Sequence, residues 1–221
     1  MKKAVILFNL GGPDKLENVE PFLFNLFNDP AILSLPSFFR FPLAKLIANR
    51  RTPTAQKIYK ELGGSSPILK LTEEQSYALE TRLNKDDNLS NYKCFIVMRC
   101  WHPRAENVVK KVINYNPDEI ILMPLYPQYS AATSGSSIKE WNDICLKNNF
   151  NVKTSTICCY PTDKNFVEAH KEEIILMPLY PQVSAATSGS SIKEWNDVGV
   201  KNNYKVKAST ICCYPTDESF I

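Results

Sequence analysis

A cationic, aromatic and glycine-rich stretch in the first third of the sequence carries the side chains best suited to bind a ligand. Arg50 and Arg51 are adjacent, Tyr59 follows about two helical turns later, and Ser66 lies in the polar turn Gly-Gly-Ser-Ser-Pro. Arginine presents a planar fork of donors that matches a carboxylate, and tyrosine offers a flat face and a hydroxyl. The set predicts a flat ligand with acid groups. A solvated basic helix end is the alternative.

Two loops add hydroxyl and backbone groups. Ser130 to Ser137 precedes a predicted helix, where free N–H groups suit a carboxylate or phosphate, although ordinary N-capping explains the same composition. Gly11-Gly12-Pro13 permits close approach to a ligand or simply a tight turn. The sequence contains neither G-x-G-x-x-G nor G-x-x-x-x-G-K-[ST], so it supports neither dinucleotide nor triphosphate binding.

Histidine and cysteine offer little acid–base or metal chemistry. His102 follows a predicted strand and either lies near a ligand or packs in its loop, whereas His170 is expected to be a solvated helix residue. The adjacent pairs at 158–159 and 212–213 lack the C-x-x-C spacing of zinc and redox sites. We expect them to be reduced thiols in buried strands, and we predict no metal site and no cofactor.

The elements that must position these residues alternate along the chain. Apolar runs predict strands over 4–9, 92–98, 120–125 and 152–158. Helical periodicity predicts helices over 19–28, 43–49, 54–62, 72–83, 103–115 and 134–147. Thr72 is expected to be the N-cap of its helix in a capping-box pattern. The alternation predicts an α/β fold with a parallel sheet covered on both faces, in which ligands bind at the carboxyl ends of the strands.

Composition excludes several classes of protein. A hydrophobic content of 44% excludes disorder, and a formal net charge of +3 is too mild for a nucleic-acid binder. No apolar run approaches the roughly 18 residues needed to cross a bilayer. The run that starts at Ala4 is short and ends at Gly11-Gly12, so it favours a strand over a signal peptide, and we expect a cytoplasmic protein.

The C-terminal quarter of the sequence repeats an earlier segment. Residues 119–167 and 173–221, aligned at an offset of 173 − 119 = 54, are identical at 39 of 49 positions. Only two copies occur, which favours a recent duplication over a solenoid. Two near-identical strand–helix–strand segments would compete for one slot in the sheet. The losing copy would extend the sheet or expose apolar strand edges, and exposed edges promote self-association.

Five motifs, in order and spacing, resemble those of the ferrochelatase family. They are FNLGGPD, RRTPxxQxxY, GGSSPI, MRCWHP and PLYPQYSAATSGSS, and the similarity covers about Lys3 to Val167. The resemblance implies a chelatase fold with two Rossmann-like lobes around a porphyrin cleft. It also implies insertion of Fe²⁺ into protoporphyrin IX in haem biosynthesis, and peripheral membrane contact as in some relatives. Residues 1–167 would form the N-terminal lobe, and 173–221 would duplicate part of it.

The resemblance places the porphyrin contacts on Arg51, Tyr59 and Ser66, with Arg99 lining the cleft. Cys100 departs from the family, because many relatives have tyrosine there. A larger departure concerns the S-A-H-[GS]-[LI]-P motif, whose histidine accepts protons or contacts the metal in the family, since these 221 residues do not contain it. We therefore assign no catalytic residue and expect impaired catalysis. The alternatives are a non-catalytic tetrapyrrole-binding lobe and a non-functional gene remnant.

Overall fold

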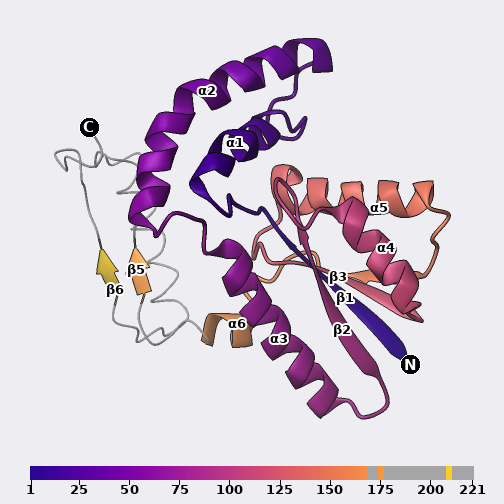
Figure 1. The fold of residues 1–221 in the computed structure, drawn as a ribbon. Coiled ribbons are helices and arrows are strands. Elements are labelled where there is room, and N and C mark those ends of the chain that lie inside the picture. Colours follow the sequence, from indigo (N-terminus) through magenta and orange to yellow (C-terminus); the bar gives the residue numbers. More distant parts are fainter. Residues whose placement is uncertain (169–173, 177–207, 211–221) are drawn as a thin grey trace. The chain divides into compact units, whose positions relative to one another are not determined.

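A parallel four-stranded sheet organises the first part of the chain (Figure 1). The computed structural model describes residues 1–168, 174–176 and 208–210. The strands are β1 (Lys2–Asn9), β2 (Asn91–Met98), β3 (Glu119–Pro124) and β4 (Lys153–Thr156), in the order β2-β1-β3-β4. The predicted parallel sheet is therefore confirmed, with β1 at its centre between β2 and β3.

Helices cover both faces of this sheet, as expected. Ala4, Ile6 and Phe8 of β1 pack with α4 (Ala105–Tyr115) and α5 (Ser136–Lys147). Val5 and Leu7 point to the opposite face, which α3 (Ile68–Asp86) covers. Successive side chains of a strand alternate between faces, so a continuous apolar run is what a strand buried on both sides requires.

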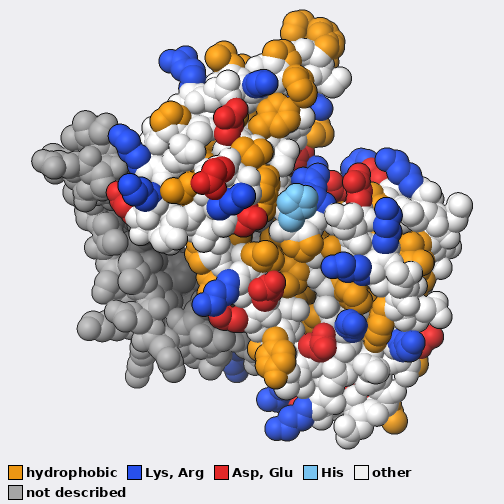
Figure 2. Space-filling model, in the orientation of Figure 1, with side chains coloured by type: hydrophobic (Ala, Val, Ile, Leu, Met, Phe, Trp, Pro, Cys, Tyr) orange, Lys and Arg blue, Asp and Glu red, His pale blue; other side chains and the backbone are white. Residues whose placement is uncertain are grey.

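Two further helices, α1 (Val19–Phe27) and α2 (Ser37–Glu61), pack on the loop that follows β2. The prediction of two helices interrupted near Pro53 is wrong, because α2 is one helix with Pro42 and Pro53 inside it. Each proline removes a backbone N–H, and the helix curves rather than ends (Figure 1). The N-terminal half of α2 exposes apolar side chains at the surface (Figure 2).

The start of α3 also differs from the prediction. The helix begins at Ile68, so Thr72 lies within it and is not an N-cap. The Thr72 hydroxyl donates to the Ile68 carbonyl at 2.7 Å and accepts from the Asn9 amide at 3.1 Å. The side chain is 1% exposed, so burial is tolerated because both of these hydrogen bonds form. Thr72 thereby fastens α3 to the end of β1.

The chain divides into two compact units, Met1–Cys159 and Tyr160–Ile221. In the second unit the structure describes α6 (Lys164–Glu168), β5 (Ile174–Leu176) and β6 (Ala208–Thr210). β5 and β6 form a two-stranded parallel sheet of their own. Its pairs, such as Ile174 with Ala208, follow the corresponding β3–β4 pairs, such as Ile120 with Thr154, by 54 residues. The repeat therefore keeps the register of the original pairing.

The structure bears on the predictions for the remaining histidine and cysteine residues and for membrane spans. His170 and the pair at 212–213 lie outside the described residues. Cys158 and Cys159 follow the end of β4 and are exposed, so the expectation of buried strand thiols is wrong for this pair. Across the described ranges, no helix is long and apolar enough to span a bilayer.

Candidate functional site

Three loops meet beyond the carboxyl ends of β1 and β2. Gly11 adopts φ +87°, and a Cβ added to it would lie 3.0 Å from Trp101 Cβ. A Cβ on Gly12 would overlap the Ser66 side chain, and the Ser66 N–H donates to the Pro13 carbonyl at 2.7 Å. The glycines are thus required for close packing of the loops. The packing joins the loop after β1 to the loop after β2 and to the turn before α3.

Two of the four predicted porphyrin contacts lie around this junction. Ser66 is half-buried, and its hydroxyl accepts the Ile68 N–H at 3.3 Å. Tyr59 packs against the cluster that contains Cys100 and Trp101, and its carbonyl accepts the Gly64 N–H at 2.7 Å. Burial raises the pKa of Tyr59, so its hydroxyl remains a hydrogen-bond donor at neutral pH.

Arg51 is the exposed cation of the predicted set. Its guanidinium lies 5.4 Å from the centre of the Phe27 ring, which is a cation–π distance. No carboxylate in the described part of the chain forms an ion pair with it. Its charge is therefore available to an acidic ligand.

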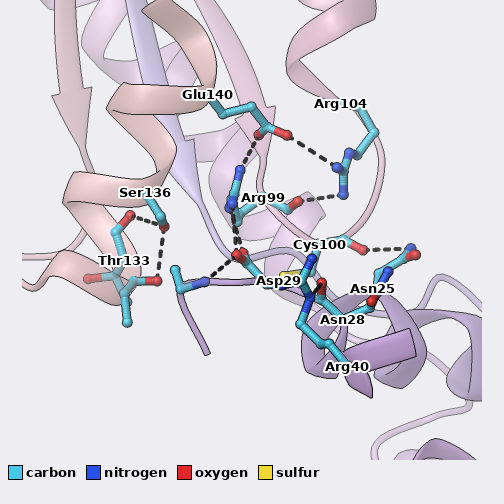
Figure 3. Close-up of polar contacts among 12 residues, drawn as sticks. Asn25, Asn28, Asp29, Arg40, Arg99, Cys100, Arg104, Thr133, Ser136 and Glu140 are labelled. Atoms are coloured by element: carbon cyan, nitrogen blue, oxygen red, sulfur yellow. Dashed lines mark hydrogen bonds and ion pairs between the residues drawn. The ribbon is translucent and has the colours of Figure 1, made fainter. Parts of the chain in front are cut away.

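Arg99, by contrast, is held by two carboxylates (Figure 3). Its Nε and Nη2 donate to the two oxygens of Asp29 at 2.7 and 2.9 Å, and its Nη1 lies 2.8 Å from Glu140 Oε2. Arg104 pairs with the other Glu140 oxygen at 3.2 Å and donates to the Arg99 carbonyl. The Arg99 and Asp29 side chains are 13% and 5% exposed.

This network is electrically balanced, because it contains two arginines and two carboxylates. Burial opposes the charge of Arg99, but the hydrogen bonds to Asp29 and the charge of Glu140 outweigh it and raise the Arg99 pKa. Asp29, Arg104 and Glu140 are not among the residues that the sequence predicts for the site. Asp29 and Arg99 are separated by 70 residues, and no local pattern connects them.

An open pocket of about 590 Å³ lies beside this network. Its lining includes Arg99, Glu140, Tyr129, Gly135 and Ser136. Its volume falls within the roughly 300–1,000 Å³ that small-molecule sites occupy. Of the four predicted contacts, Arg99 alone lines this pocket, whereas Arg51, Tyr59 and Ser66 do not.

The hydroxyl-rich loop is partly used by its own backbone. The Ser130 hydroxyl accepts the Ala132 N–H at 3.2 Å, which is the capping role that the sequence left open. The Ser136 hydroxyl donates to the Ala132 and Thr133 carbonyls (Figure 3). These two hydroxyls therefore shape the turn that leads into α5.

The loop after β2 contributes few bases. Cys100 is 1% exposed, and burial raises its pKa to about 11, so its thiol stays protonated. Burial also raises the pKa of Tyr126, which lies after β3. His102 is exposed and packs edge-to-face on Trp101, with ring centres 5.3 Å apart. Its imidazole thus packs in its own loop.

Sheet order, converging loops and pocket together define an α/β protein with a Rossmann-like lobe and a candidate binding site at the carboxyl edge of its sheet. A family model described as Ferrochelatase matches residues 2–175 and, a second time, residues 168–221. The chain belongs to the ferrochelatase family.

The relatives that it resembles are themselves named ferrochelatase. The protein of Pelagibacter ubique (strain HTCC1062) is 77% identical over 175 residues, which cover 79% of this chain and 51% of that protein. The protein of Wolbachia sp. subsp. Drosophila simulans (strain wRi) is 52% identical over 170 residues, covering 77% and 54%. That of Caulobacter vibrioides (strain NA1000 / CB15N) is 47% identical over 173 residues, covering 78% and 49%. The chain spans about half the length of the curated relatives it matches.

The ion pairs of Arg99 should contribute to the stability of the folded first unit. Asp29→Asn should lower the free energy of unfolding of the first unit by about 3–5 kcal/mol, because it leaves a buried guanidinium with one carboxylate fewer. The exposed pair Arg82–Asp86 provides the control, and Asp86→Asn should cost less than about 1 kcal/mol. Urea unfolding followed by circular dichroism measures both. Equal effects of the two changes would contradict the assigned role.

Proposed function

We propose that this chain is the porphyrin-binding lobe of a ferrochelatase-like protein of haem biosynthesis, with protoporphyrin IX as its ligand and Fe²⁺ as the metal substrate. The observation that carries this proposal is the convergence of three motifs at one edge of the sheet. Gly12 packs on Ser66, and Gly11 packs on Trp101, so segments far apart in sequence form one surface. Membership of the ferrochelatase family supplies the ligand.

The predicted contacts take different roles in this proposal. Arg51, exposed and without an ion pair among the described residues, binds an acid group of the porphyrin through its planar fork. The protonated Tyr59 hydroxyl and the Ser66 hydroxyl provide further donors. Arg99 lines the cleft as part of a neutralised wall, because its donors are occupied by Asp29 and Glu140.

Metal insertion has a further requirement, because two pyrrole N–H protons must leave the macrocycle. The buried groups near the site, Cys100 and Tyr126, have raised pKa values and are not bases at neutral pH. The S-A-H motif does not occur in these 221 residues. Loss of an acid–base group lowers a rate by about 10²–10⁴. We therefore propose that the 221-residue polypeptide binds porphyrin but does not measurably catalyse metal insertion.

Quenching of protoporphyrin IX fluorescence tests the binding. We expect saturable quenching, and Arg51→Ala should weaken binding by about 10- to 100-fold, because a hydrogen bond to a charged group contributes about 1.5–3 kcal/mol. Arg82→Ala is the matched control, since Arg82 is an exposed arginine on α3.

The same mixtures, supplied with Zn²⁺ or Fe²⁺ and followed by absorbance, should form metalloporphyrin no faster than a protein-free mixture. Metalloporphyrin formation above that background would contradict the proposed loss of catalysis. Quenching that does not saturate would contradict the proposed porphyrin binding.

We further propose a cytoplasmic protein that contacts a membrane surface through α2. Phe38, Phe39 and Phe41 are 68%, 59% and 54% exposed, and they lie in the N-terminal half of α2. Hydrophobic side chains gather at this end of the helix in Figure 2. Their rings can enter the interfacial layer of a bilayer without spanning it. The contact would bring the cleft to an apolar substrate.

Vesicle co-sedimentation tests this contact. Phe38→Ser combined with Phe39→Ser should lower partitioning into phosphatidylcholine vesicles at least about tenfold, because burying one phenylalanine contributes about 1.5–3 kcal/mol. Leu89→Ser changes an 89% exposed side chain outside α2 and should have no effect. Equal partitioning of all three proteins, or none by the parent, would argue against the contact.

The repeated segment also has a place in this proposal. We infer a lobe over 1–167, followed in 173–221 by a duplicate of its strand–helix–strand unit. The shared register of β3–β4 and β5–β6 supports this, as does the second family match over 168–221. Within the described ranges β5 pairs with β6 alone, so we propose that its other edge mediates self-association.

A charge placed on β5 tests the self-association. Ile175→Lys should shift the chain toward monomer in sedimentation velocity, because a lysine on an edge strand opposes strand pairing. Leu89→Lys adds the same charge at an exposed position away from β5 and should leave the association unchanged. A parent chain that is monomeric at all concentrations, or an Ile175→Lys chain that associates like the parent, would reject the proposal.

A further inference from the structure

Two adjacent exposed thiols stand apart from the other described cysteines. Cys158 and Cys159 are exposed, whereas Cys94, Cys100 and Cys145 are buried or half-buried. Burial raises the pKa of Cys94 to about 12 and those of Cys100 and Cys145 to about 11. These three side chains are at least partly shielded from solvent, whereas those of the pair are open to it. Among the cysteines that the structure describes, thiol chemistry is therefore concentrated at the pair.

The two cysteines lie just beyond the end of β4. Along a strand, successive side chains point to opposite faces. β4 ends at Thr156, and the Ile157 N–H donates to the Leu122 carbonyl at 2.9 Å. Beyond that anchor the backbone leaves the strand, so the opposed arrangement of successive strand side chains no longer applies to Cys158 and Cys159. The sheet thus holds the base of the pair while both sulfur atoms face solvent.

Two sulfur donors without a third protein ligand suit an ion or atom that needs only two sulfur ligands. Thiolates select soft ions, and zinc sites in proteins usually need about three or four protein ligands. In the part of the chain that the structure describes, no group of three or more His, Cys, Asp or Glu side chains could hold a metal ion. A centre that is satisfied by two sulfur ligands matches the pair better, and trivalent arsenic bearing one organic group is such a centre.

We propose that Cys158 and Cys159 form a dithiol binding site for soft, thiophilic centres that accept two sulfur ligands, of which a monosubstituted trivalent arsenical is the representative. Binding of R–As(OH)₂ forms two As–S bonds and breaks two As–O bonds. The two thiol protons leave with the two hydroxyl groups as two molecules of water, so no oxidant or reductant is consumed. Because both ligands are tethered to adjacent residues, the affinity should exceed that of a single thiol by about 10²–10⁴.

Phenylarsine oxide is the probe for this site. The 221-residue chain is used with Cys212→Ser and Cys213→Ser, because the repeat contains a second adjacent pair outside the described residues. The native protein receives one equivalent of probe and then excess 2-mercaptoethanol, and intact-mass spectrometry counts the adducts. We expect one phenylarsenic group per chain that resists the monothiol and is released by 2,3-dimercaptopropanol.

Single substitutions separate the pair from the other thiols. In the same background, Cys158→Ser and Cys159→Ser should each lower the affinity at least about 100-fold, because one thiol cannot chelate. Cys94→Ser is the control, since it removes a half-buried thiol, and its adduct should be unchanged. Circular dichroism checks that each variant is folded. A monothiol-resistant adduct in Cys158→Ser, or no retained adduct while the pair is intact, would overturn the proposal.

Discussion

A charged guanidinium that is largely withdrawn from solvent must have carboxylate partners, and this constraint organises the carboxyl edge of the sheet. Arg99 follows β2, and its two partners come from the connection between α1 and α2 and from α5. A buried arginine without such partners would be strongly destabilising. The electrostatic requirement of one side chain therefore fixes three segments that surround the candidate site (Figure 3).

The same constraint divides the cations of the site into two kinds. Arg99 and Arg104 are neutralised by Asp29 and Glu140 and act as a framework. Arg51 touches an aromatic ring and carries an uncompensated charge among the described residues. In the sequence, Arg51, Arg99 and Arg104 all look alike, because each is an arginine near a predicted loop. Their surroundings decide which of them can meet a ligand, because a donor that is already occupied has little to offer a second acid group.

The sequence predicts the layered fold, which follows from local apolar patterns, but it misses two local details of the helices and the pairing of distant charges. The apolar run of β1 requires burial on both faces, so the parallel sheet and its covering helices could be anticipated. Pro53 suggested a break, but α2 bends and continues through it. Thr72 looks like a cap in the sequence and instead satisfies its hydroxyl inside α3. The pairing of Asp29 with Arg99 has no local signature, since it exists only once the chain is folded.

The short sheet of the second unit has a consequence for how this architecture grows. β5 meets β6 in the alignment that β3 and β4 use, although no counterpart of β1 adjoins β5 in the described ranges. The residues that set this alignment therefore lie within the repeated segment itself. A strand pair that carries its own register in this way is modular, so repetition of such a segment can extend a parallel arrangement without any change elsewhere in the chain.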